Sequence, residues 1–117
     1  MKTHFQNIIV IILFLCFAAP VWSQQKIATD TLSVTGVCEM CKKRIENAAF
    51  IKGVKWAEWD VNNQQLVVIY KTKKTDLDEI ASAVAHSGHD NGISKAPDEA
   101  YAKLPDCCAY RDGVKVH

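Results

Sequence analysis

The amino-acid sequence predicts an α+β domain in which two helices cover one face of a four-stranded antiparallel sheet. Segments with apolar side chains at every second position alternate with segments in which they recur every three or four positions, in the order β-α-β-β-α-β. Each predicted helix has one apolar stripe, which must be buried against another element. Placing both helices on the same face of the sheet buries both stripes, which is the ferredoxin-like arrangement.

The first half of the domain predicts a strand, a helix and a second strand. Residues 26–35 alternate polar and apolar side chains, and Gly36 ends this strand. The segment from Cys41 to about Phe50 predicts a helix, because its apolar residues recur at helical spacing. These residues are Cys41, Ile45, Ala48 and Ala49. Residues 54–61 alternate again, which predicts the second strand of the sheet.

The second half predicts a hairpin partner, a helix and a weak last strand. The asparagines at 62–63 suit the hairpin turn, and the strand after them has Leu66, Val68 and Tyr70 on its inner face. The second helix begins at a Thr75 or Asp76 cap and ends at Gly88. Its apolar stripe consists of Leu77, Ile80, Ala81, Val84 and Ala85. A short last strand is expected at 91–95.

The chain divides into a leader at 1–23, the predicted domain at 24–96 and a tail at 97–117. The leader has a short basic start, an apolar run and small Ser23 at its end, which predicts a secretory signal peptide. Its apolar run is shorter than the ~20 residues that a membrane-spanning helix requires, and an uncleaved anchor is the alternative. We therefore expect the mature protein to be secreted across the inner membrane, into the periplasm or beyond.

Charge and composition exclude several function classes. The formal net charge is +1, so there is no basic surface for nucleic acid and no polybasic run for anionic lipid. Membrane contact is expected only through the leader, if it is uncleaved. The sequence has no glycine-rich phosphate loop and no Ser/His/Asp arrangement that its spacing would single out. We therefore expect the protein not to be an enzyme.

The pair Cys38 and Cys41 lies between the first predicted strand and the first predicted helix. The partial positive charge of a helix N-terminus favours a thiolate, and the two intervening residues let both sulfurs converge. Two soft thiolates suit Cu(I), which accepts low coordination numbers. A partner's thiolates can then add to the ion before the first two leave, so that it is transferred without being released.

The loop around these cysteines resembles the heavy-metal-associated domain family. It reads Gly-Val-Cys-Glu-Met-Cys at 36–41 and continues Lys-Lys-Arg-Ile-Glu at 42–46, and the resemblance extends over about 31–93. The family includes copper chaperones, modules of copper-transporting ATPases and the periplasmic component of mercuric-ion transport. It usually has Met at the position of Gly36.

This resemblance implies the ferredoxin-like fold and metal binding through Cys38 and Cys41. Cu(I) is the expected ion, as the commonest cargo of the family, and Hg(II) and Zn(II) are the alternatives. The expected partner is a metal donor or acceptor, such as a metal-transporting membrane protein. The protein is expected to be a monomer or a metal-bridged dimer.

Four further residues are candidate ligands. His89 follows the second helix, where the loop of the family approaches the metal, and it is either a third ligand or a solvated surface residue. Met40 either adds a thioether or faces a partner. The adjacent Cys107 and Cys108 extend the first cysteine pair, form a disulfide, or bind a second soft ion.

Two other functions compete with metal transfer. A cysteine pair at a helix N-terminus is also the arrangement of thiol–disulfide oxidoreductases, which would make the protein an enzyme. Alternatively, the four cysteines of the mature chain could close a structural zinc site. The predicted apolar core argues against the zinc module, because the fold can form without metal.

Overall fold

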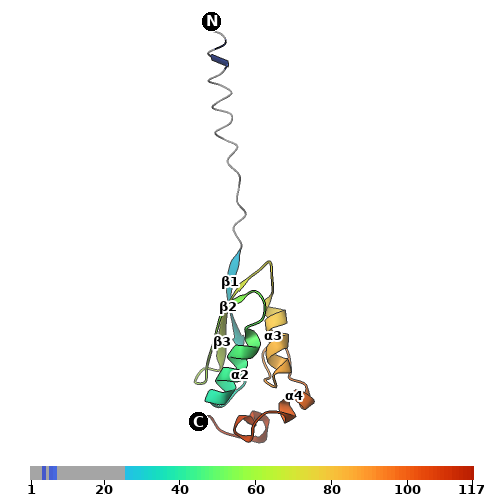
Figure 1. Cartoon of the computed structure of the whole chain (residues 1–117). Coiled ribbons are helices and arrows are strands. Elements are labelled where there is room, and N and C mark those ends of the chain that lie inside the picture. Colours follow the sequence, from blue (N-terminus) through green and yellow to red (C-terminus); the bar gives the residue numbers. More distant parts are fainter. Residues whose placement is uncertain (1–3, 5, 8–25) are drawn as a thin grey trace.

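The computed structural model describes residues 4, 6–7 and 26–117 (Figure 1). Most of the predicted signal peptide therefore lies outside the described residues. Six elements follow one another from residue 27: β1 (Ile27–Ser33), α2 (Glu39–Ala49), β2 (Val54–Asp60), β3 (Gln65–Lys71), α3 (Leu77–His86) and α4 (Asp98–Ala102). Two short 3-10 turns, η1 (Asp106–Cys108) and η2 (Tyr110–Asp112), complete the tail. None of the helices in the described part is long and apolar enough to span a bilayer.

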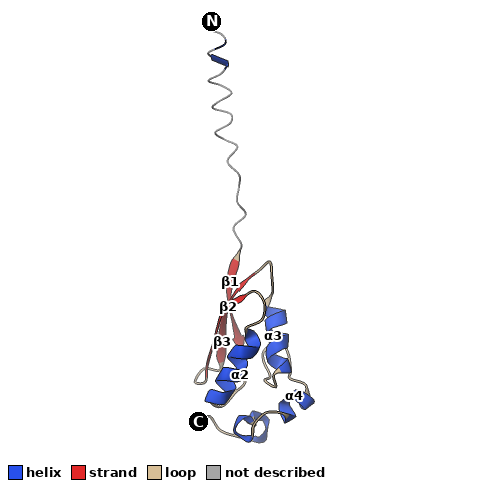
Figure 2. Ribbon diagram, in the orientation of Figure 1, coloured by secondary structure: helices blue, strands red, loops and turns tan. Residues whose placement is uncertain are grey.

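The three strands form an antiparallel sheet in the order β1-β3-β2, with β3 in the centre. Leu66 of β3 is paired with Leu32 of β1 on one side and with Trp59 of β2 on the other, and all three side chains are buried. Figure 2 shows α2 and α3 on the same side of the sheet. The predicted α+β, ferredoxin-like fold is confirmed.

The two helices bury the residues that their periodicity predicts. Cys41, Ile45 and Ala49 are buried on α2, and Ile80, Ala81, Val84 and Ala85 are buried on α3. Asp76 caps α3, because its carboxylate accepts a 2.8 Å hydrogen bond from the N–H of Glu79. Gly88 adopts φ +109° just after α3, as expected of the residue that ends a helix.

The last predicted strand differs from the structure. Within the described residues, segment 91–95 makes only an isolated bridge, between Asn91 and Val34. The Asn91 carboxamide oxygen accepts hydrogen bonds from the N–H groups of Ile93 and Ser94, and the Asn91 N–H donates to the Ser94 carbonyl. These local bonds turn the chain before it can continue along β1.

The tail packs across the end of the domain at which α2 begins (Figure 1). Arg111 binds Asp90 through two nitrogens, at 2.7 and 3.1 Å, and Asp98 at 3.0 Å. The Tyr110 hydroxyl donates to the Gly88 carbonyl at 2.7 Å and accepts from the N–H of Asp90 at 2.9 Å. The N–H of His117 donates to the Val37 carbonyl, beside the first cysteine. The tail is thus attached to the loop after α3 and, through its last residue, to the residue that precedes Cys38.

Candidate metal centre

Three cysteine sulfurs meet at the N-terminus of α2. The Sγ atom of Cys38 lies 3.3 Å from that of Cys41 and 3.5 Å from that of Cys108. All three sulfurs lie within 4.8 Å of one another, and all three residues are buried. The tail therefore brings Cys108 to the predicted pair, whereas Cys107 stays outside the group, so only one of the two tail cysteines lies where it could extend the pair.

The backbone at the start of α2 directs the predicted pair toward one point. Cys38 immediately precedes the helix and is extended, with φ −155° and ψ 175°. Its carbonyl accepts the hydrogen bond of the first helical turn, from the N–H of Lys42 at 3.0 Å. Cys41 follows within that turn, so both sulfurs lie at the positive end of the helix dipole.

Gly36 allows a tryptophan to support the cysteine loop from below. A Cβ atom on Gly36 would lie 2.9 Å from Cη2 of Trp59 and 3.2 Å from Cβ of Cys41. The Trp59 indole is completely buried, and its N–H donates to the Val34 carbonyl at 3.0 Å. The space beneath the loop is therefore filled by Trp59, and Gly36 is required by this close approach.

The three thiols differ in how easily they ionise. Burial raises the pKa of Cys38, but the N–H groups of Cys41 and Met40 and the neighbouring thiols outweigh this effect and lower the pKa to about 7. Burial raises the pKa of Cys41. Burial and the hydrogen bonds to the other two thiols raise the pKa of Cys108. As the pH rises, Cys38 therefore ionises before the other two thiols. A cation that binds all three sulfurs must displace the protons of Cys41 and Cys108.

Two more sulfurs lie at the rim of this cluster. The Sγ atom of Cys107 lies 3.5 Å from Sδ of Met40 and 4.0 Å from Sγ of Cys108. A surface hollow of about 370 Å³ is lined by Cys38, Glu39, Met40, Cys107 and His117. Cys107 thus lies outside the three-thiol group, and the described cysteines are all free, without a disulfide.

His89 does not join the sulfurs. It is completely buried, its Nδ1–H donates to the Thr35 carbonyl at 2.8 Å, and its ring stacks on Tyr110 with centroids 5.5 Å apart. Burial lowers the pKa of His89, so the ring is neutral at pH 7. The surface interpretation of His89 is therefore wrong, and the described cluster of ligand atoms does not include its nitrogens. The ring supports the docked tail.

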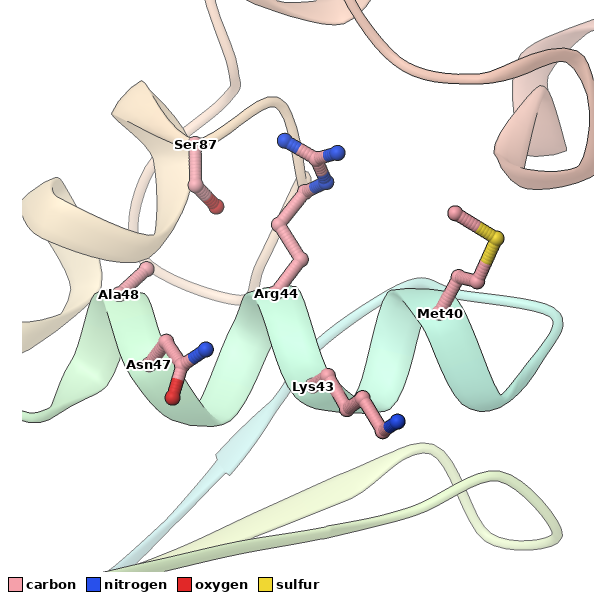
Figure 3. A pocket seen from close by; sticks show the side chains of 6 residues that line it. All are labelled: Met40, Lys43, Arg44, Asn47, Ala48 and Ser87. Atoms are coloured by element: carbon pink, nitrogen blue, oxygen red, sulfur yellow. The ribbon is translucent and has the colours of Figure 1, made fainter.

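A second hollow, of about 550 Å³, follows the exposed side of α2. Figure 3 shows Met40 at the N-terminal end of this helix, with Arg44 directed toward Ser87 and Lys43 directed to the other side. Lys42 instead forms an ion pair with Glu46 at 2.8 Å. Lys43 and Arg44 therefore give the surface beside the cysteines a local positive charge.

Two residues at this site could not be predicted from the sequence. Arg111 anchors the tail through its ion pairs, and His117 lines the hollow of about 370 Å³ beside Met40 and Cys107. Arg111 and its partner Asp90 are separated by 21 positions, a spacing that no helix or strand period connects. His117 had no signal at all, because a residue at the end of a polar segment belongs to no recognisable pattern.

Comparisons with known proteins agree with this geometry. The family model of the heavy-metal-associated domain matches residues 31–90. The solved structure of a CopZ metallochaperone is 30% identical to this chain, with a TM-score of 0.53, and the match covers 55% of this chain and 98% of that one. Oxidized MerP from Ralstonia metallidurans CH34 is 26% identical, with a TM-score of 0.54, over 60% of this chain and 100% of that one.

A third solved structure supports the fold only. It is a putative copper-ion-binding protein from Bacillus anthracis, 21% identical, with a TM-score of 0.54 over 58% of this chain and 99% of that one. A search of curated proteins found no significant match. The matched structures are covered almost completely, so the part of this chain that they leave unmatched is additional to the shared domain.

Proposed function

The chain belongs to the heavy-metal-associated domain family, and on this premise we propose that it binds Cu(I) and exchanges the ion with a partner protein. The proposed ligands are the thiolates of Cys38, Cys41 and Cys108. The observation that carries this proposal is the convergence of these three sulfurs within 4.8 Å of one another. Three soft thiolates favour Cu(I) over harder ions, and Hg(II) and Zn(II) are the other candidates.

The positions of the three ligands suggest how the ion is handed over. Cys38 and Cys41 belong to one helical turn, whereas Cys108 belongs to the separately attached tail. Cys108 can therefore be replaced by a thiolate of the partner while the other two sulfurs still hold the ion. Each exchange then forms a new metal–sulfur bond before an old one breaks, and the oxidation state of the ion does not change.

We further propose that the protein works outside the cytoplasm and is not an enzyme. The pattern of residues 1–23 supports the location. The proposed partner is a metal-transporting membrane protein or another thiol-bearing carrier. Lys43 and Arg44 lie beside the cysteines, which favours a partner with an acidic contact surface.

Anaerobic metal titration tests the proposal. The purified, reduced protein should retain one Cu(I) against a competing chelator and should prefer it to Zn(II). The double variant Cys38→Ser/Cys41→Ser should lose this tight binding. Lys73→Ala, on an exposed turn away from the sulfurs, is the control and should bind as the wild type does. Equal binding by the double variant and the wild type would contradict the proposal.

One observation favours a second candidate function. The pKa of Cys38 is lowered to about 7, and its sulfur lies 3.3 Å from that of Cys41, as a thiol–disulfide oxidoreductase would require. An insulin-reduction assay separates the two functions. Sustained turnover by the metal-free protein would favour the oxidoreductase. The zinc module has less support, because Cys107 contacts Met40 and lies outside the three-thiol group.

A further inference from the structure

Five sulfur atoms form a continuous series from the surface to the buried cluster. Starting from Met40, the steps are 3.5 Å to Cys107, 4.0 Å to Cys108, 3.5 Å to Cys38 and 3.3 Å to Cys41. The outer two sulfurs are accessible and the inner three are buried: Met40 is 52% exposed and Cys107 is half-buried, whereas Cys108 and Cys41 are completely buried and Cys38 is 5% exposed. Each sulfur–sulfur distance in the series is short enough for one metal ion to bind both sulfurs at once.

The contact between the outer sulfurs, those of Met40 and Cys107, is only partly explained by packing, because Cys107 packs against the core and Met40 does not. Met40 belongs to the first turn of α2 and Cys107 to the tail, 67 positions away, so no local structure forces them together. A methionine that is half exposed contributes little to the hydrophobic core. Thioether and thiolate are both soft ligands, and together they suit Cu(I) better than Zn(II).

The surroundings of the outer pair leave room for an ion. The hollow of about 370 Å³ lies against both sulfurs and is also lined by Cys38, Glu39 and His117. Cys38 therefore borders the outer hollow and belongs to the inner cluster at the same time. The Nδ1–H of His117 is engaged with the Lys115 carbonyl at 2.7 Å, which leaves Nε2 as the nitrogen available to an ion.

We propose that Met40 and Cys107 form an outer subsite at which Cu(I) arrives and from which it leaves. This inference rests on the proposed function, because it requires the inner three-thiol site as the destination. The ion passes inward along the sulfur series, and Cys108 and Cys38 receive it from the outer pair.

The transfer is balanced at each step. Cu(I) bound to the Cys107 thiolate and the Met40 thioether first gains a bond to the Cys108 sulfur, whose proton passes to water. The bond to Met40 then breaks, and the bond to Cys107 breaks as the Cys38 thiolate adds. Cys41 adds last, and its proton also passes to water. Cys107 takes up a proton from water. Charge and oxidation state are conserved, and no redox partner is needed.

Stopped-flow loading tests the subsite. Reduced protein is mixed anaerobically with Cu(I) in a weak coloured chelator, and the rate of colour loss is measured for wild type, Met40→Leu and Cys107→Ser. Removal of either outer sulfur should slow loading by about tenfold or more, because the ion is no longer concentrated beside the inner site. The equilibrium affinity of the inner site should change much less than the rate. Lys73→Ala, on the exposed turn away from the sulfurs, is the control and should load as fast as the wild type.

Methyl NMR gives a readout that does not depend on kinetics. The chain has two methionines, Met1 and Met40, so labelled methyl groups give two signals at most, and Met40→Leu assigns them. In Cys38→Ser/Cys41→Ser, Cu(I) should still shift the Met40 methyl signal weakly, and adding Cys107→Ser should abolish the shift.

The outcomes separate this inference from the function on which it rests. Loading rates within about twofold of wild type in both single variants, with no methyl shift, would overturn the outer subsite but leave the inner site standing. A wild-type protein that binds no Cu(I) would overturn both. Unfolding does not confuse the result, because Met40 is exposed and each single variant is checked by circular dichroism.

Discussion

The family domain at 31–90 and the tail at 97–117 are held in place by different kinds of contact. The domain has a continuous apolar core, from Leu32 on β1 to Val84 on α3. In the tail, Cys108 is the one buried residue, and Leu104, Tyr110 and Val114 pack only partly buried against the core. Polar attachments add to these contacts: the ion pairs of Arg111 and the hydrogen bonds of Tyr110. The domain is therefore stabilised mainly by complete apolar burial, whereas partial burial and surface ion pairs hold the tail, which should open at a lower cost than the domain unfolds.

The largest effect is expected in the core of the domain. Ile45→Ala on α2 removes a completely buried side chain and should lower the free energy of unfolding by about 2–5 kcal/mol. Urea denaturation of the metal-free protein measures this change. The control is Lys43→Ala on the exposed side of the same helix, which should change it by less than about 0.5 kcal/mol. A small effect of Ile45→Ala would mean that the core does not carry the stability.

A substitution in the tail should lower the metal affinity more than it lowers the folding stability. Cys108→Ser removes one of the three proposed ligands, and we expect the Cu(I) affinity to fall by about tenfold or more. The unfolding midpoint of the metal-free protein should change little, because only one small side chain is altered. Competition titration and urea denaturation on the same sample check both statements. Unchanged affinity would remove Cys108 from the site.

A smaller effect is expected where the tail is attached. Arg111→Ala breaks the ion pairs with Asp90 and Asp98 and should lower the stability of the docked tail by about 1 kcal/mol. The tail then opens more often, so Cys108 should react faster with an alkylating reagent, as followed by peptide mass mapping. Lys103→Ala, an exposed change in the same tail, should leave the reaction rate unchanged.

The smallest expected effect comes from protonation of Asp90, which occurs only in acid. Burial alone would raise the pKa of Asp90, but hydrogen bonds from Arg111 and the N–H of Ala96 outweigh it and lower the pKa. Ionised Asp90 therefore stabilises the docked tail at pH 7, and this contribution is lost as the pH falls below about 4. NMR of the Arg111 side chain should show the loss, and Asp90→Asn should remove its pH dependence. A tail that stays docked in acid would contradict this role.

The domain could be predicted from the sequence because its elements are periodic. Alternation at 54–61 and the apolar stripe from Leu77 to Ala85 each reflect burial on one face, and the structure buries those faces. The last strand was predicted wrongly, because the side chain of Asn91 forms a local turn that no hydrophobic pattern reveals.

Only part of the candidate site could be predicted, because only part of it belongs to a periodic element. Cys38 and Cys41 share one turn of helix, so their spacing alone predicts that they converge. Cys108 reaches them only because Arg111 and Tyr110 attach the tail to residues near Asp90. The burial of His89 likewise depends on Tyr110, 21 positions along the chain. Contacts between a non-periodic segment and a distant loop leave no mark in local composition.

Because Cys108 lies beside Cys38 and Cys41 in the proposed site, the protein would hold within one molecule a thiol that takes the place of an acceptor's thiol. An acceptor must then compete with a rival that is tethered at high effective concentration. Small thiols in dilute solution would compete poorly, whereas a docked protein presenting two cysteines at once would succeed. Under the proposed function, the tail would therefore allow release only to a docked partner protein and would limit loss of the ion between carriers.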